Sequence, residues 1–97
     1  MEKGKNNIWK AIYENHTIIL KAVTHIIKID VELEIDDRVF DSYTIGLEKK
    51  QIIDLKGTFV EDGKDYIVLI RIVAGRDIMT FPTMYINNQE IPITKIC

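Results

Sequence analysis

The chain has 97 residues, 46% hydrophobic and 29% charged, which is the composition of one globular domain rather than of a disordered chain. A net charge of −2 lacks the basic footprint of a nucleic-acid binder, so we expect neither DNA nor RNA as a partner. The single cysteine, Cys97, leaves no intrachain disulfide, and no apolar run reaches the roughly 18 residues that span a bilayer. We therefore expect a cytoplasmic protein that binds no membrane.

The first half of the chain predicts a series of antiparallel strands. After a polar start, residues 1–7, which we expect to be flexible, apolar alternation predicts strands over 8–13, 17–23, 27–35 and 39–45. The third of these strands alternates most strictly, with aliphatic residues at odd positions and mostly acidic residues at even positions. We expect its odd-numbered side chains in the core and its even-numbered carboxylates in water.

The second half predicts further strands, over residues 52–60, 65–74, 78–86 and 91–96. The charged segment 46–51 before them is predicted to be a turn, with a single helical turn as the alternative. Glu61-Asp62-Gly63-Lys64 predicts a hairpin turn, because glycine supplies a positive φ. Pro82 falls inside the predicted strand 78–86 and donates no ladder hydrogen bond, so that strand is expected at a sheet edge or at a bulge.

Two paired turn sequences, Asp36-Asp37 and Asn87-Asn88, occur 51 positions apart. Asp and Asn tolerate the left-handed backbone of tight hairpin turns, so each pair predicts a register. In the first hairpin Leu33 would face Phe40, and in the second Met84 would face Ile91. The same offset aligns the apolar strands of the two halves, which is consistent with an internal duplication.

Short strands at regular spacing, with turn chemistry between them and no βαβ unit, indicate an all-β fold. We predict a single antiparallel β-sandwich over residues 1–97, with seven to nine short strands and a possible internal pseudo-twofold repeat. A small barrel is the alternative.

A run of carboxylates on one strand and its turn forms the main candidate site: Asp30, Glu32, Glu34, Asp36 and Asp37. Alternate carboxylates on a strand lie about 7 Å apart, whereas a calcium site needs them within about 2.5 Å of one ion. We therefore predict no metal site, and interpret the run as a solvated face or as a surface for a basic partner.

Aromatic residues are scattered over the predicted strands, where most are expected in the core. Trp9 and Tyr85 have polar neighbours and are the candidates for an exposed surface that binds a sugar or a peptide. His16 and His25 fall at predicted turns and are expected at the surface. The chain has no recognisable nucleophile and base arrangement and no glycine-rich phosphate loop, so we predict no catalytic residue and no cofactor.

Several segments together resemble the β-sandwich domain of the Fas apoptotic inhibitory molecule family. They are Trp9, His16-x-Ile18-x-Leu20, Ile35-Asp36-Asp37, Gly57-x-Phe59-Val60-Glu61-Asp62-Gly63, Gly75 and Tyr85-Ile86-Asn87-Asn88-Gln89-Glu90-Ile91. The likeness consists mainly of apolar alternation and turn residues, and members of the family usually carry two such domains. It implies a non-catalytic β-sandwich that acts through protein contacts, and it transfers no active-site residue.

These observations predict a small, non-catalytic, cytoplasmic module that binds another protein through its acidic strand face or through a sheet edge. The edge expected at Pro82 would suit strand addition or homodimerisation. The alternative function is a β-sandwich that binds a small ligand or a carbohydrate through exposed aromatic side chains. An enzyme that uses loop carboxylates is the third possibility.

Overall fold

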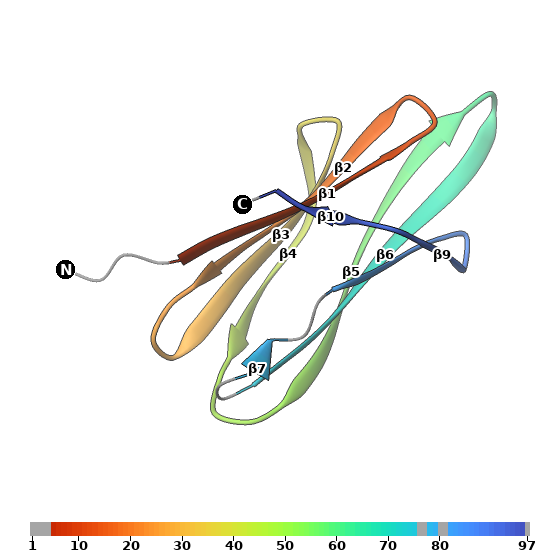
Figure 1. The fold of residues 1–97 in the computed structure, drawn as a ribbon. Helices are drawn as coiled ribbons and strands as arrows, with labels where there is room; N and C mark the ends of the chain where they lie inside the picture. Colours follow the sequence, from red (N-terminus) through yellow and green to blue (C-terminus); the bar gives the residue numbers. More distant parts are fainter. Residues whose placement is uncertain (1–4, 76–77, 80–81, 97) are drawn as a thin grey trace.

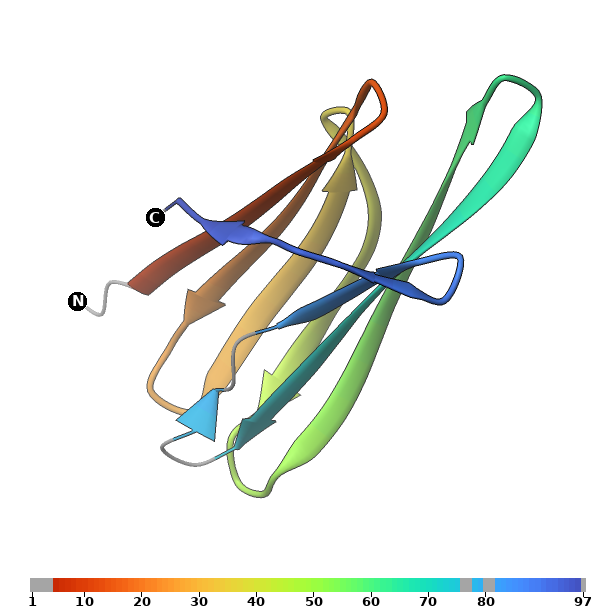
Figure 2. The same cartoon turned by 45° about the vertical axis from the view of Figure 1, so that its right-hand side comes forward.

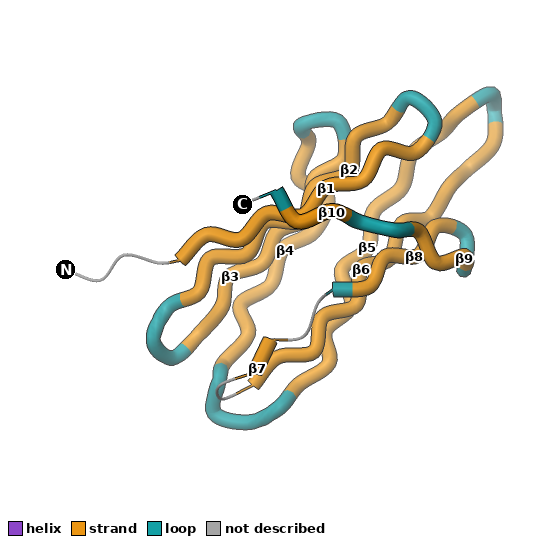
Figure 3. The backbone as a smooth tube through the Cα atoms, in the orientation of Figure 1, coloured by secondary structure: helices purple, strands orange, loops and turns teal. Residues whose placement is uncertain are grey.

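The computed structural model describes residues 5–75, 78–79 and 82–96, which are built from strands and turns (Figure 3). Within these residues nine strands lie along two antiparallel sheets, five in the first and four in the second, and the sheets do not close into a barrel. The two-residue β7, Ile78–Met79, adds to the side of the second sheet. Figures 1 and 2 show the two sheets as separate layers. The predicted all-β, two-layer fold is therefore confirmed.

The first sheet is a meander of the four N-terminal strands with one short strand from the C-terminal end of the chain. Its order is β10-β1-β2-β3-β4. The strands are β1 (Lys5–Tyr13), β2 (His16–Thr24), β3 (Lys28–Ile35), β4 (Arg38–Gly46) and β10 (Thr94–Lys95). β1 begins within the polar start of the chain, so the paired strand includes residues 5–7, which we had expected to be flexible.

The second sheet has the order β5-β6-β8-β9, and β7 pairs with the end of β6. Its strands are β5 (Gln51–Glu61), β6 (Lys64–Gly75), β8 (Thr83–Ile86) and β9 (Gln89–Ile91). After β9 the chain crosses from the second sheet to the first, where β10 pairs with β1 (Figure 2). The two sheets are thus linked by the turn between β4 and β5 and by this crossing segment.

The core lies between the inner faces of the two sheets. Cross-strand partners in an antiparallel pair project to the same face, so one row of the first sheet places Trp9, Leu20 and Leu33 side by side on the inside. The matching row of the second sheet is Leu55, Ile70 and Met84. All six side chains are buried. The odd-numbered aliphatic residues of β3 point inward, as its alternation predicted. The prediction is wrong for Ile27, which precedes the first residue of β3 and is 71% exposed.

Both paired turns adopt the predicted left-handed backbone, with φ of 52° and 66° at Asp36 and Asp37 and of 49° and 68° at Asn87 and Asn88. The register of the second hairpin is confirmed, because Met84 faces Ile91.

The predicted register of the first hairpin is wrong by one residue. A β-bulge between Leu33 and Glu34 leaves Phe40 as an extra residue in β4, so Leu33 faces Asp41 instead. The bulge turns Phe40 toward Gly57 of β5, where the two strands make close contact.

The two sheets share a strand order and the same pair of hydrogen bonds at one turn, which agrees with the predicted internal repeat. The order β1-β2-β3-β4 of the first sheet recurs in the second as β5-β6-β8-β9. In the first sheet, the Thr17 N–H donates to Asp36 Oδ1 at 2.9 Å, and the Asp36 N–H donates back to the Thr17 carbonyl. In the second, Ile67 and Asn87 exchange the same two bonds. In both sheets the side chain of the first turn residue thus caps the neighbouring strand.

The predicted strand over 78–86 is interrupted, and its predicted position at an edge is wrong. Pro82 is buried and precedes the first residue of β8, while positions 80 and 81 lie outside the described residues. β8 lies between β6 and β9, so it offers no free edge. A proline just before a strand needs no ladder hydrogen bond, which removes the reason to place it at an edge. The predicted turn over 46–51 is confirmed and contains no helical turn.

We expect the Gly57→Ala substitution to destabilise the protein by about 1 to 3 kcal/mol, as overpacking of a core typically does. A Cβ atom at this position would lie 2.9 Å from Ile35 Cδ1 and 3.0 Å from Phe40 Cβ, so the β4–β5 contact would have to open. Urea unfolding followed by circular dichroism measures the effect.

The matched control is Gly46→Ala, because a Cβ atom there meets nothing within 4 Å. We expect this control to stay within about 0.5 kcal/mol of the wild type. Equal stabilities for the two variants would show that β5 does not approach β4 as closely as described.

Candidate functional site

A groove on the outer face of the first sheet contains part of the predicted acidic surface. It has a volume of about 590 Å³ and crosses β2, β3 and β4. Its lining residues are Lys21, Val23, Asp30, Val31, Glu32, Ser42, Tyr43 and Thr44. Asp30 and Glu32 lie on one face of β3, as the strand alternation predicted, and both line this groove. Tyr43 also borders the groove, but it faces the inward-pointing Val31 across the strands, so its ring projects to the other side of the sheet.

Glu34 does not remain in water, which corrects the expectation for this strand. Only 8% of its surface is exposed, and Lys21 Nζ lies 2.8 Å from its Oε2. Its cross-strand partners are the aliphatic Ile19 and Val39, so the carboxylate lies among apolar neighbours and depends on one cation. The hydrogen bond from Lys21 holds the pKa of Glu34 below its usual value and raises the pKa of Lys21.

Glu32 has the opposite electrostatic environment. The adjacent Glu34 raises the pKa of Glu32, because a proton on Glu32 can be hydrogen-bonded to the Glu34 carboxylate, and partial burial adds to the effect. The ionised form of Glu32 is thus disfavoured on the bare protein. A cation arriving in the groove would relieve this repulsion.

Asp30 is held in place by two neighbours at one end of the groove. The Thr44 hydroxyl donates to Asp30 Oδ1 at 2.7 Å, and His25 Nε2 lies 3.1 Å from Asp30 Oδ2. The bond from Thr44 is the main cause that lowers the pKa of Asp30, so this carboxylate stays ionised at neutral pH. His25 is half-buried rather than fully at the surface.

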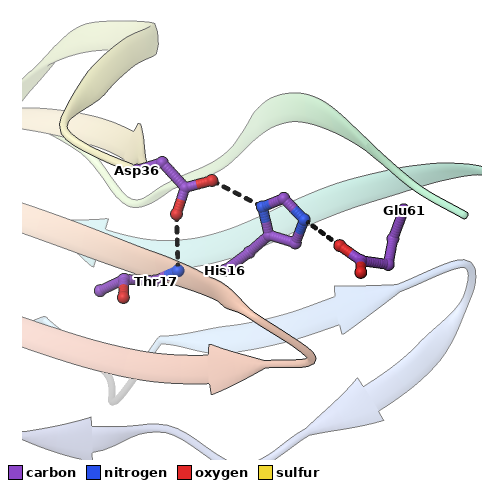
Figure 4. Close-up of polar contacts among 4 residues, drawn as sticks. All are labelled: His16, Thr17, Asp36 and Glu61. Atoms are coloured by element: carbon purple, nitrogen blue, oxygen red, sulfur yellow. Dashed lines mark hydrogen bonds and ion pairs between the residues drawn. The ribbon is translucent and has the colours of Figure 1, made fainter.

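Asp36 and Asp37 lie in the β3–β4 turn and do not line the groove. Asp37 is exposed there. Asp36 instead joins a polar cluster at the end of the sandwich (Figure 4). The Thr17 N–H and His16 together hold the pKa of Asp36 below its usual value.

His16 is the centre of this cluster, and the prediction that it is an ordinary surface residue is wrong. Its Nδ1 lies 2.5 Å from Asp36 Oδ2, and its Nε2 lies 2.7 Å from Glu61 Oε2 (Figure 4). Only 16% of its side chain is exposed. Asp36 belongs to the first sheet and Glu61 ends β5 of the second, so the imidazole bridges the two layers.

Aromatic rings pack beneath this bridge. The His16 ring stacks on Phe59 at a centroid distance of 4.2 Å, and Phe59 stacks on Tyr66 at 5.0 Å. Tyr13 meets Tyr66 edge to face at 5.7 Å. His16 and Glu61 are 45 residues apart in the chain, so no local motif could reveal their contact. The register of the first hairpins was the one signal available, because it brings Asp36 beside Thr17.

The two predicted aromatic site residues do not form a common surface. Trp9 is only 5% exposed and faces the core, so its assignment to an exposed binding surface is wrong. Its polar neighbour Lys10 lies on the opposite face of β1, while the indole points inward. Tyr85 pairs with Leu69 and Glu90 on the outer face of the second sheet and is half-buried.

Among the residues that the structure describes, no group of three histidine, cysteine or acidic side chains could hold a metal ion. The same part of the chain contains no helix long and apolar enough to cross a membrane. No family model matches the chain, and no curated protein or solved structure is significantly similar to it. The resemblance to the Fas apoptotic inhibitory molecule family therefore stays a prediction.

We expect opposite stability effects from two neutral substitutions on β3 at pH 7, each within about 1 kcal/mol. Glu32→Gln should stabilise the protein, because it removes the repulsion that raises the pKa of Glu32. Glu34→Gln should destabilise it, because a carboxyl with a lowered pKa stabilises the fold above its unfolded pKa of 4.5.

Urea unfolding at neutral and acidic pH tests both signs. The destabilisation caused by Glu34→Gln should disappear as the pH falls through the lowered pKa of Glu34. Two effects of the same sign at pH 7 would contradict the assignment.

We expect the single tryptophan to emit at short wavelength and to resist quenching by acrylamide, because Trp9 is buried. Trp9→Ala should cost about 3 to 5 kcal/mol in urea unfolding. Tyr85→Ala should lower the free energy of unfolding by clearly less, because Tyr85 is only half-buried. Emission and quenching like those of a free tryptophan would show that Trp9 is exposed and does not lie in the core.

Proposed function

We propose that this protein is a non-catalytic interaction module that binds a basic segment of another protein in the groove on the outer face of the first sheet. The observation that carries the proposal is the juxtaposition of the Asp30 and Glu32 carboxylates in that groove. Its volume of about 590 Å³ would accommodate one or two long side chains of a partner.

The charges in the groove favour a cation. Asp30 has a lowered pKa and remains ionised at neutral pH. The groove's own lysine, Lys21, is engaged by Glu34. A lysine or arginine from a partner would pair with Asp30 and Glu32, and its aliphatic stem could lie against Val23 in the groove.

The sheet edges give less support to binding by strand addition or to a homodimer built in that way. The edge of β4 lies against β5, where the Lys56 N–H donates to Asp41 Oδ2 at 3.0 Å. The outer strands β9 and β10 have only three and two residues, and short edge strands pair poorly with another chain. The face of the first sheet is therefore the better candidate.

The alternative function, binding of a carbohydrate, loses its main support because Trp9 is buried. Tyr43, the aromatic residue that borders the groove, shares the face of the inward-pointing Val31, so it offers no ring to a sugar in the groove. Thermal shift measurements with a panel of sugars test this alternative directly, since a site filled at 100 times its dissociation constant adds about 2.7 kcal/mol.

We expect the protein to bind lysine- and arginine-containing peptides on an array and to ignore the same peptides with alanine at the basic positions. Glu32→Lys should weaken binding about tenfold or more, because it places like charges together. Raising the salt concentration should also weaken it. Fluorescence polarisation with the best peptides gives the affinities.

The control is Glu48→Lys, which makes the same change of charge at an exposed turn residue outside the groove. We expect it to bind within about twofold of the wild type once salt screens the long-range charge. Equal losses in the two variants, or binding that does not distinguish basic from alanine peptides, would refute the proposed site.

A further inference from the structure

We propose that His16 is a proton-dependent latch that holds the end of the β5–β6 hairpin against the first sheet. This inference is independent of the groove and concerns the opposite, inner side of the first sheet. The latch consists of His16 and its partners Asp36 and Glu61 (Figure 4). The Phe59 ring, which stacks on the imidazole, completes it.

The geometry requires a charged imidazole. Both ring nitrogens of His16 face carboxylate oxygens, at 2.5 and 2.7 Å. An ionised carboxylate only accepts hydrogen bonds, so both nitrogens must carry a proton for both contacts to form. In the neutral ring, one nitrogen would turn a lone pair toward a carboxylate.

The contact with Glu61 is the one that deprotonation would break. Asp36 is tied to the first sheet by two hydrogen bonds with the Thr17 backbone, in addition to its bond with His16. Glu61 stands at the end of β5, immediately before the Asp62-Gly63 turn. A neutral His16 that keeps its proton on Nδ1 would remain bonded to Asp36 and would repel Glu61.

Three further carboxylates, those of Glu14, Asp37 and Asp62, are exposed in the turns at this end of the sandwich. The other charged and titratable groups there contact aromatic rings. Lys64 of β6 lies 5.4 Å from the centre of the Tyr66 ring. Arg38 of β4 lies 5.7 Å from the centre of the Phe40 ring. Tyr13 of β1 packs on Tyr66. None of these contacts replaces the proton that His16 shares with its two carboxylates.

The direction of the pH effect follows from the same contacts. Asp36 is the largest cause that raises the pKa of His16 above its ordinary value of 6.5, desolvation opposes it, and Glu61 raises the pKa further. The latch therefore contributes fully below pH 6.5 and is lost as the pH rises through the raised pKa of the folded state. Opening would uncover the stacked rings of Phe59 and Tyr66.

Nuclear magnetic resonance on the whole chain tests the latch. The measurement compares the nuclear Overhauser cross-peaks between the His16 and Phe59 rings at about pH 5.5 and at about pH 8.5. The titration of the His16 ring is followed in the same samples. We expect these inter-sheet peaks to weaken roughly threefold or more at the higher pH, which is the scale set by losing one hydrogen bond. Peaks within the first sheet should not change.

Two variants make the test specific. In Glu61→Gln the new amide can accept from a protonated ring and donate to a neutral one, so the peaks should persist at both pH values. His25→Gln changes the other histidine, which pairs with Asp30 within the first sheet, and should leave the wild-type pH dependence intact.

Three results would overturn the latch. The first is a His16 ring that titrates without any change in the inter-sheet peaks. The second is a Glu61→Gln variant that keeps the wild-type pH dependence or lacks the peaks at both pH values. The third is a His25→Gln variant that loses the pH dependence.

Discussion

Burial of two aliphatic sheet faces against each other is the interaction on which the rest of the structure depends. Rows such as Trp9, Leu20 and Leu33 on one sheet meet rows such as Leu55, Ile70 and Met84 on the other, and these side chains are almost completely removed from water. A one-residue slip of any central strand would exchange its inner and outer side chains. The registers, and with them the outer groove, are therefore held by the core.

Specific contacts between β4 and β5 hold the two sheets together at one edge, in addition to the core. The bulge in the β3–β4 hairpin directs Phe40 toward Gly57, and only the absence of a side chain at Gly57 lets the two strands approach. Asp41 then caps a backbone N–H of β5. These contacts join the free edge of the first sheet to the second, which removes an edge that could otherwise pair with another chain.

The polar clusters of the molecule divide between two different tasks. On the outer face of the first sheet, Glu34 is neutralised by Lys21, and this leaves Asp30 and Glu32 to define the character of the groove. Between the sheets, His16 satisfies two carboxylates from different layers. The groove is suited to a partner's cation because it is open. The His16 bridge is suited to a structural role because its two carboxylates already share one cation.

The sequence by itself determined the strands, the tight turns and the inward face of β3, because alternation with period two and the left-handed preference of Asp and Asn are local properties. It also placed Asp30 and Glu32 on one face. Only the tertiary structure decided that Glu34 is buried, that Trp9 faces the core and that His16 reaches Glu61. Each of these depends on a bulge or on the packing of one sheet over the other, and such contacts join residues far apart in the chain and leave no local pattern.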